Sequence, residues 1–64
     1  MKINGKKFME ARIKSGLGRT EIGRVGKVSF ARIFQIETSD YSNVNDFSVE
    51  AMACKMGIEA YMLK

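Results

Sequence analysis

Residues 19–38, RTEIGRVGKVSFARIFQIET, decide the fold expected for this chain. Their apolar residues occur as two pairs with i, i+3 spacing: Ile22 with Val25, and Ile33 with Ile36. This spacing puts each pair on one side of a helix. The stretch therefore predicts two short helices, each with one buried stripe.

Between the two pairs, Gly26 and Lys27 interrupt the helical period. We expect Gly26 to end the first helix, because glycine adopts the left-handed backbone conformation at little cost. Ser29 is placed to cap the second helix, since its hydroxyl can accept from the unpaired backbone N–H groups. The expected motif is a helix, a sharp turn and a second helix at about residues 30–37.

The second of these helices has one side suited to reading DNA bases. Steps of 100° per residue turn Ile33 and Ile36 inward, near Glu37. The opposite side and its flanks carry Phe30, Ala31, Arg32, Phe34, Gln35 and Thr38. Gln can bond adenine and Arg can bond guanine in the major groove, while Ala or Phe can contact a thymine methyl group. Two other interpretations stay open: one phenylalanine packs in the core, or the pair forms a protein-binding patch.

Over residues 8–63 the chain resembles the lambda-repressor-like helix-turn-helix family of phage repressors and Cro-type proteins. The matching positions are Arg12, Gly16-Leu17, Glu21-Ile22-Gly23, Val28-Ser29, Ile33, Ile36-Glu37, Ala53, Met56-Gly57-Ile58 and Met62-Leu63. With the helical patterns, the resemblance implies an all-α fold, a compact bundle of about five short helices in which helices 2 and 3 form the helix-turn-helix. It also implies an ion pair between Arg12 and Glu37, and a dimer contact near Tyr61 and Met62.

Three positions depart from the pattern of that family. Gly23 stands where the family usually has alanine, as a smaller substitute that lowers helix stability. Lys27 occupies the position of the turn glycine, one residue after Gly26. Arg19 replaces a common glutamine at the start of the motif.

The formal net charge of +4 is unevenly distributed along the chain. Residues 1–32 hold nine basic and two acidic side chains, whereas residues 33–64 hold two basic and five acidic ones. A basic field of this kind favours binding to a polyanion through phosphate contacts. The expected phosphate contacts are Lys6, Arg19, Lys27 and Ser29. The alternative for Lys6 and its neighbouring lysines is simple solvation.

The remaining elements are predicted from caps and turn residues. Residues 4–17 are expected to form the first helix, capped by Asn4 and ended by Gly16. Residues 38–47, TSDYSNVNDF, are rich in turn formers and predict a loop. Asp46 or Ser48 is then expected to cap a fourth helix.

The apolar face of this fourth helix is expected to comprise Phe47, Val49, Met52, Ala53 and Met56. Gly57 is predicted to stop the helix. Residues 58–63 predict a short final helix, and its methionine and tyrosine can serve either the core or a partner surface.

Length and composition exclude several classes of protein. A chain of 64 residues suits one domain, here residues 1–64, with a small core. It has one cysteine and no histidine, so neither a disulfide framework, nor a metal site, nor His-based catalysis is expected. Cys54 lies in an apolar run and is predicted to be a buried thiol in a cytoplasmic protein. No cofactor, small-molecule substrate or membrane segment is indicated.

These observations predict a sequence-specific regulator that binds double-stranded DNA as a homodimer and is not an enzyme. A repressor or Cro-like protein of a phage or mobile element fits best. The alternative is a protein-interaction module on the same scaffold, for example one that binds a regulatory partner or acts like an antitoxin. Its contact patch would use Phe30, Phe34 and Tyr41.

Overall fold

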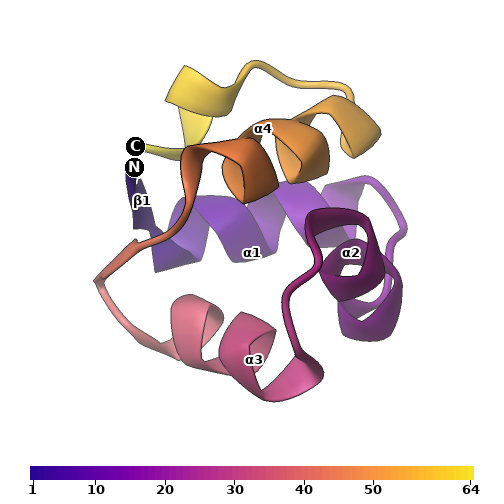
Figure 1. The fold of residues 1–64 in the computed structure, drawn as a ribbon. Helices are drawn as coiled ribbons and strands as arrows, with labels where there is room; N and C mark the ends of the chain where they lie inside the picture. The colour runs from indigo at the N-terminus through magenta and orange to yellow at the C-terminus, as the bar shows by residue number, and fades with distance from the viewer.

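The computed structural model describes residues 1–64. It contains four α-helices, a two-stranded sheet and a final 3-10 turn, in the order β1 (Lys2–Asn4), α1 (Gly5–Lys14), α2 (Arg19–Gly26), α3 (Phe30–Thr38), β2 (Tyr41–Asn43), α4 (Asp46–Lys55) and η1 (Ala60–Leu63). In Figure 1, α1 crosses the middle of the molecule, with α4 and η1 on one side of it and α3 on the other. The fold is therefore compact and mostly helical.

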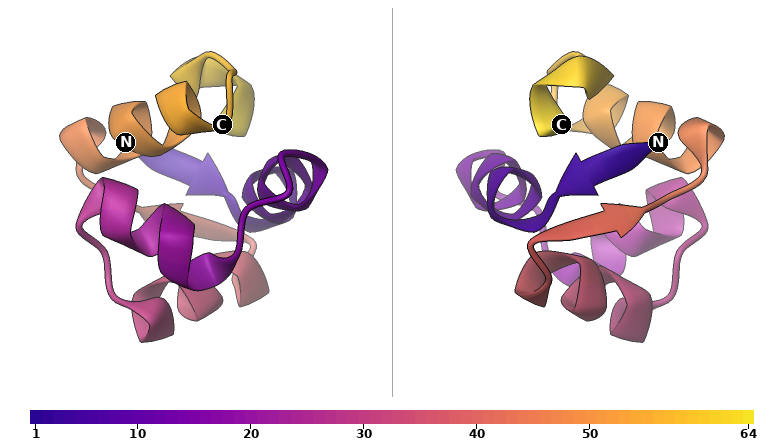
Figure 2. Two further views of the ribbon diagram at one scale, coloured as in Figure 1. Left: turned by 90° about the vertical axis from the view of Figure 1, so that its right-hand side faces the viewer. Right: turned by 90° about the vertical axis from the view of Figure 1, so that its left-hand side faces the viewer.

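The sheet corrects the expectation of an all-α bundle of five helices. Strands β1 and β2 pair antiparallel, with Ile3 opposite Ser42. Val44 N–H donates to Met1 O at one end of the ladder, and Gly5 N–H donates to Asp40 O at the other. Ile3 points inward and is completely buried. Figure 2 shows the sheet on one side of the molecule, between α3 and the C-terminal elements. The turn-rich stretch at 38–47 thus contains a strand, which turn residues alone did not reveal.

The first helix is shorter than the predicted range of residues 4–17. Asn4 caps it as expected, because its side chain accepts from Lys7 N–H. The helix ends at Lys14, and Gly16 follows with φ +73°. The hydroxyl of Ser15 donates to Ala11 O within α1 and to Met56 O at the end of α4, so it links these two helices.

The fourth helix has a different cap from those predicted, and it buries the predicted apolar face except for Phe47. Asn45 is the cap, because its Oδ1 accepts from Phe47 N–H and Ser48 N–H. Asp46 and Ser48 instead lie in the first turn of the helix. Phe47 is 69% exposed, and Cys54 is exposed too. Both were expected inside, but the face formed by Val49, Met52 and Ala53 is the one that meets the core.

One cluster of eleven buried apolar residues forms the core. It comprises Ile3, Phe8, Ile22, Ile33, Ile36, Val44, Val49, Met52, Ala53, Met56 and Leu63. Every α-helix and both termini contribute, since Ile3 comes from β1 and Leu63 from η1. Burial of this shared surface is the main force that holds such short helices together. None of the helices combines the length and the apolar character needed to span a membrane.

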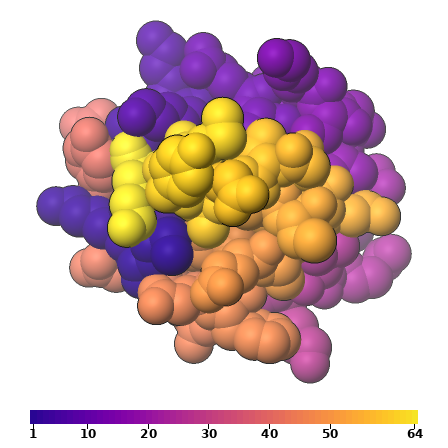
Figure 3. All heavy atoms as spheres, turned by 90° about the horizontal axis from the view of Figure 1, so that it is seen from above, coloured from indigo at the N-terminus to yellow at the C-terminus, as the bar shows by residue number.

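The C-terminal residues close one end of the molecule. Figure 3 looks down on this end and shows them at the centre of the face, beside α4. Leu63 is buried below, whereas Tyr61 and Met62 are exposed. The predicted final helix at residues 58–63 is a 3-10 turn over Ala60–Leu63.

Candidate nucleic-acid interface

Helix α3 presents one side to solvent and buries the other. Ser29 caps its start by accepting from Arg32 N–H, as expected from the sequence. Ile33 and Ile36 are completely buried. The residues exposed along the helix are Phe30, Ala31, Phe34, Gln35 and Thr38. The periodic pattern thus placed the two sides of this helix correctly.

A buried carboxylate fastens α3 to the two preceding helices. Glu37 has no exposed side-chain surface, and both Nε and Nη2 of Arg12 donate to it. Arg19 Nε donates to the same carboxylate at 2.8 Å. The structure therefore forms the ion pair that the resemblance implied, and Arg19 adds a second arginine to it. Bidentate Arg–carboxylate geometry sets the orientation of α3.

Close contacts with the backbone of glycine residues fix α3 at its end and fix the turn that precedes it. A Cβ on Gly5 would lie 2.1 Å from Ser39 O and 2.3 Å from Ile36 O, so the start of α1 packs directly on the end of α3. A Cβ on Gly23 would lie 2.5 Å from Val28 O, which belongs to the α2–α3 turn. Gly23 is thus more than a smaller substitute for alanine, because the packing here requires glycine.

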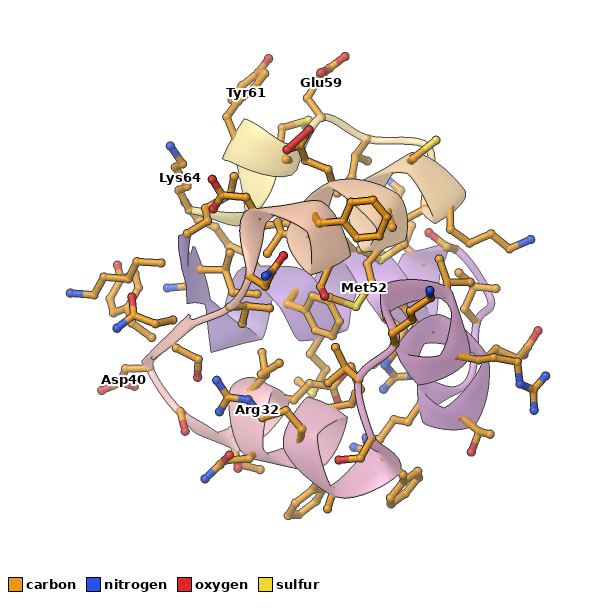
Figure 4. The ribbon with its side chains drawn as sticks, in the orientation of Figure 1. Arg32, Asp40, Met52, Glu59, Tyr61 and Lys64 are labelled. Carbon is orange, nitrogen blue, oxygen red and sulfur yellow. The ribbon has the colours of Figure 1, made fainter.

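The left-handed residue of the turn is Lys27, at φ 56° and ψ 43°, and this corrects the assignment to Gly26. Gly26 is the last residue of α2 and lies under Met52, whose Cγ would be 2.7 Å from an added Cβ. Figure 4 shows Met52 pointing from α4 toward α2. Glycine at 26 therefore provides room for packing, and Lys27 provides the turn, at the position where the resembling family has glycine.

The polar side chains on α3 are largely bonded to other parts of the protein. Arg32 Nη1 donates to Gln35 Oε1 at 2.8 Å, and Arg32 Nη2 donates to Asn43 O of β2 at 2.7 Å. Figure 4 shows Arg32 reaching away from its helix. The hydroxyl of Thr38 donates back to Phe34 O. Arg32 thus connects α3 to the strand that follows it.

Neither aromatic residue of α3 belongs to the core. Phe30 is 56% exposed and Phe34 is 48% exposed, so the interpretation that one of them packs inside is wrong. The Arg19 guanidinium lies 5.3 Å from the centroid of the Phe34 ring, in cation–π range. Glu37 fixes the position of Arg19, and Arg19 packs against one side of the Phe34 ring. The rest of the ring is exposed to solvent.

Basic side chains lie near both ends of α3. At its start, a polar hollow is lined by Lys27, Val28, Ser29, Arg32, Asn43, Val44, Asn45 and Ser48. At its end, a second hollow is lined by Asn4, Lys6, Lys7, Glu10, Glu37, Thr38, Ser39 and Asp40. Of these lysines, Lys7 donates to Lys64 O. Lys27 and Lys6, both expected at the DNA-binding surface, therefore line hollows at opposite ends of α3, and the hollow of Lys6 also contains the carboxylates of Glu10 and Asp40.

One capping residue and one backbone contact near this surface were not predicted from the sequence. Asn45 caps α4, and its position just before an acidic first turn was a readable signal. Asn43 contributes only its backbone carbonyl to Arg32, so its side-chain type carried no signal. Tyr61 and Met62, expected at a dimer contact, are exposed but lie in η1, at the other end of the molecule from α3 (Figures 1 and 4).

The structure has no group of three or more His, Cys, Asp or Glu side chains that could hold a metal ion. Comparison of the chain with models of protein families found no match, and neither did comparison with curated protein sequences.

Proposed function

We propose that this protein is a sequence-specific regulator that binds double-stranded DNA through a helix-turn-helix formed by α2 and α3, of the lambda-repressor-like type. The observation that carries the proposal is the exposed side of α3, from Phe30 to Thr38, combined with complete burial of Ile33 and Ile36. An α-helix with its side chains is about 10–12 Å in diameter. Helix α3 can therefore enter the major groove, which is about 12 Å wide.

Charge supports a polyanionic partner for this side of the molecule. Lys6, Lys27 and Arg32 lie in the hollows at the two ends of α3. The carboxylate of Glu37 is buried against two arginines, so it adds no exposed negative charge, and the exposed carboxylates in these hollows are Glu10 and Asp40, beside Lys6 and Lys7. Phosphate contacts by such side chains position a helix in the groove and supply much of the affinity.

Homodimerisation through Tyr61 and Met62 is part of the proposal. Both residues are exposed in η1, and Tyr61 points away from the end of the molecule that carries α3 (Figure 4). A dimer on one duplex must place its two recognition helices about 34 Å apart on one side of the DNA. An inverted repeat with this half-site spacing among selected sites would support a two-fold dimer.

The proposal is tested by selecting bound sites from random duplex DNA and measuring affinity against salt. We expect an enriched site, a steep decrease of affinity with salt, and a slope smaller by about one for Lys27→Ala. Lys55→Ala, which removes an exposed lysine at the end of α4, serves as the matched control and should leave the site, the slope and the affinity unchanged. Absence of any enriched duplex, or affinity that does not depend on salt, would refute the proposal.

A second function is favoured by the exposed aromatic pair. If α3 is a protein-binding patch, Phe34→Ala abolishes binding to a protein partner and leaves any affinity for duplex DNA unchanged. The two functions are separated by the same variant, because the DNA-binding proposal requires Phe34→Ala to weaken duplex binding.

A further inference from the structure

The polar side chains on the exposed side of α3 are partly engaged by the protein itself. Arg32, the side chain best suited to guanine, donates from Nη1 to Gln35 Oε1 and from Nη2 to Asn43 O. The Thr38 hydroxyl donates to Phe34 O. Arg32 keeps three of its five N–H donors and Gln35 keeps its amide N–H groups, but both terminal nitrogens of Arg32 are already directed at protein acceptors.

The same side of α3 also carries three exposed apolar side chains. Phe30, Ala31 and Phe34 are exposed on the first turns of α3. Phe34 is also held in place, because Arg19 lies over its ring and is itself fixed by the buried Glu37 carboxylate. A side chain that is ordered before binding loses less conformational entropy when it binds.

We propose that α3 reads the 5-methyl groups of pyrimidines in the major groove of DNA, with Phe34 as the main contact and Phe30 and Ala31 beside it. The inference rests on the proposed function and names the chemical feature that the same surface recognises. The thymine methyl is the apolar group that the major groove presents, and Ala and Phe are suited to contact it. Sites rich in thymine would be preferred over otherwise similar sites without the methyl group.

The basic side chains around Phe30 and Phe34 favour the major groove of double-stranded DNA as the binding site of this surface. Lys27 and Arg32 line a hollow at the start of α3, the helix that begins at Phe30, and Arg19 lies against the Phe34 ring. An apolar strip with cations around it fits a groove floor that carries methyl groups between two rows of phosphates. Arg19 acts here as a positioning residue for Phe34, because its Nε is bound to Glu37.

Two synthetic duplexes that differ only in the methyl group test the inference and require no defined operator sequence. They are poly(dA-dT) and poly(dA-dU), titrated with the intact protein at one fixed salt concentration. Burial of one methyl group corresponds to about a fourfold gain in affinity. We therefore expect the wild-type protein to bind poly(dA-dT) about fourfold more tightly, or more where two methyl groups are contacted.

Variants separate reading of the methyl group from changes in the shape of the duplex. Phe34→Ala should bind the two polymers equally, whereas Phe34→Leu should keep part of the preference. Phe47→Ala removes an aromatic side chain that is 69% exposed on α4, and it should keep the full preference. Thermal melts check folding, which is expected to survive because both phenylalanines are exposed. A second pair, poly(dG-dC) with and without 5-methylcytosine, should show the same preference for the methylated polymer.

The outcomes distinguish this inference from the proposed function. Equal binding of both polymers by the wild-type protein would overturn methyl reading while DNA binding stands. A preference that persists in Phe34→Ala would overturn the role of Phe34, since groove shape would then explain it. Failure to bind any duplex would overturn both the inference and the function on which it rests.

Discussion

Replacement of Glu37 tests how α3 is held in this fold. Its carboxylate is fully buried and accepts from Arg12 and Arg19, whose side chains are 10% and 33% exposed. Glu37→Ala would leave the Arg12 charge buried without a partner. Arg19, being one-third exposed, can turn its charge to water and contributes less.

The expected cost is large relative to the stability of the chain. Removal of one partner from a buried ion pair costs about 3–5 kcal/mol. A domain of this length has roughly 3–10 kcal/mol of stability in total, from about 0.05–0.15 kcal/mol per residue. Glu37→Ala should therefore lower the melting temperature by about 12 °C or more, at about 4–8 °C for each kcal/mol. Arg12→Ala should cost less, because Glu37 keeps Arg19, and Arg19→Ala should cost about 1 kcal/mol or less.

Urea unfolding followed by circular dichroism measures these differences directly. Glu50→Ala is the matched control, since Glu50 is exposed on α4 and should change stability by only about 0.5 kcal/mol. The double variant Arg12→Met, Glu37→Met should recover most of the loss, because apolar side chains of similar size replace a buried pair at little cost. If Glu37→Ala costs no more than Glu50→Ala, or if Arg19→Ala is the worst of the three, the account of how α3 is fastened is wrong.

Three further predictions concern single positions. Gly23→Ala should lower the melting temperature, because the added Cβ would lie 2.5 Å from Val28 O. This loss should exceed the gain of about 1 kcal/mol that alanine brings to a helix. A variant more stable than wild type would mean that the turn between α2 and α3 is more open. Lys27→Gly should raise the stability of the fold by about 1 kcal/mol, since the left-handed conformation strains a lysine. The same variant should weaken DNA binding, because it removes a positive charge. Lys27→Asn, in which asparagine also tolerates the left-handed conformation, should weaken DNA binding equally. A hydrogen bond from the Met1 amino group, and the charge of that group, hold the pKa of Asp46 below its ordinary value of 3.8. The stability from this contact is fully present above that ordinary value and is lost as the pH falls through the lowered pKa. Asp46→Asn should therefore lose less stability than wild type between about pH 5 and pH 2, and equal losses in the two proteins would contradict this linkage.

The sequence by itself determined the elements that depend on residues close in the chain. The i, i+3 apolar pairs and the cap at Ser29 identified α2 and α3, and the period of α3 separated Ile33 and Ile36 from its exposed side. In α2 only Ile22 of its pair is buried, because Gly23 and Gly26 form the rest of the packed face and Val25 lies outside the core. These features were readable because helices are built from contacts three or four residues apart.

Only the tertiary structure decided the features that join distant residues. Ile3 pairs with Ser42 across 39 positions, and strands of three residues are too short to show a period of two. Arg19 joins Glu37 because α1 and α2 bring both arginines to one buried carboxylate. Phe47 was left outside because the core is filled by other side chains of α4. Local pattern sets which side of a helix is apolar, but the packing of the whole chain selects the residues that are buried and the charges that meet.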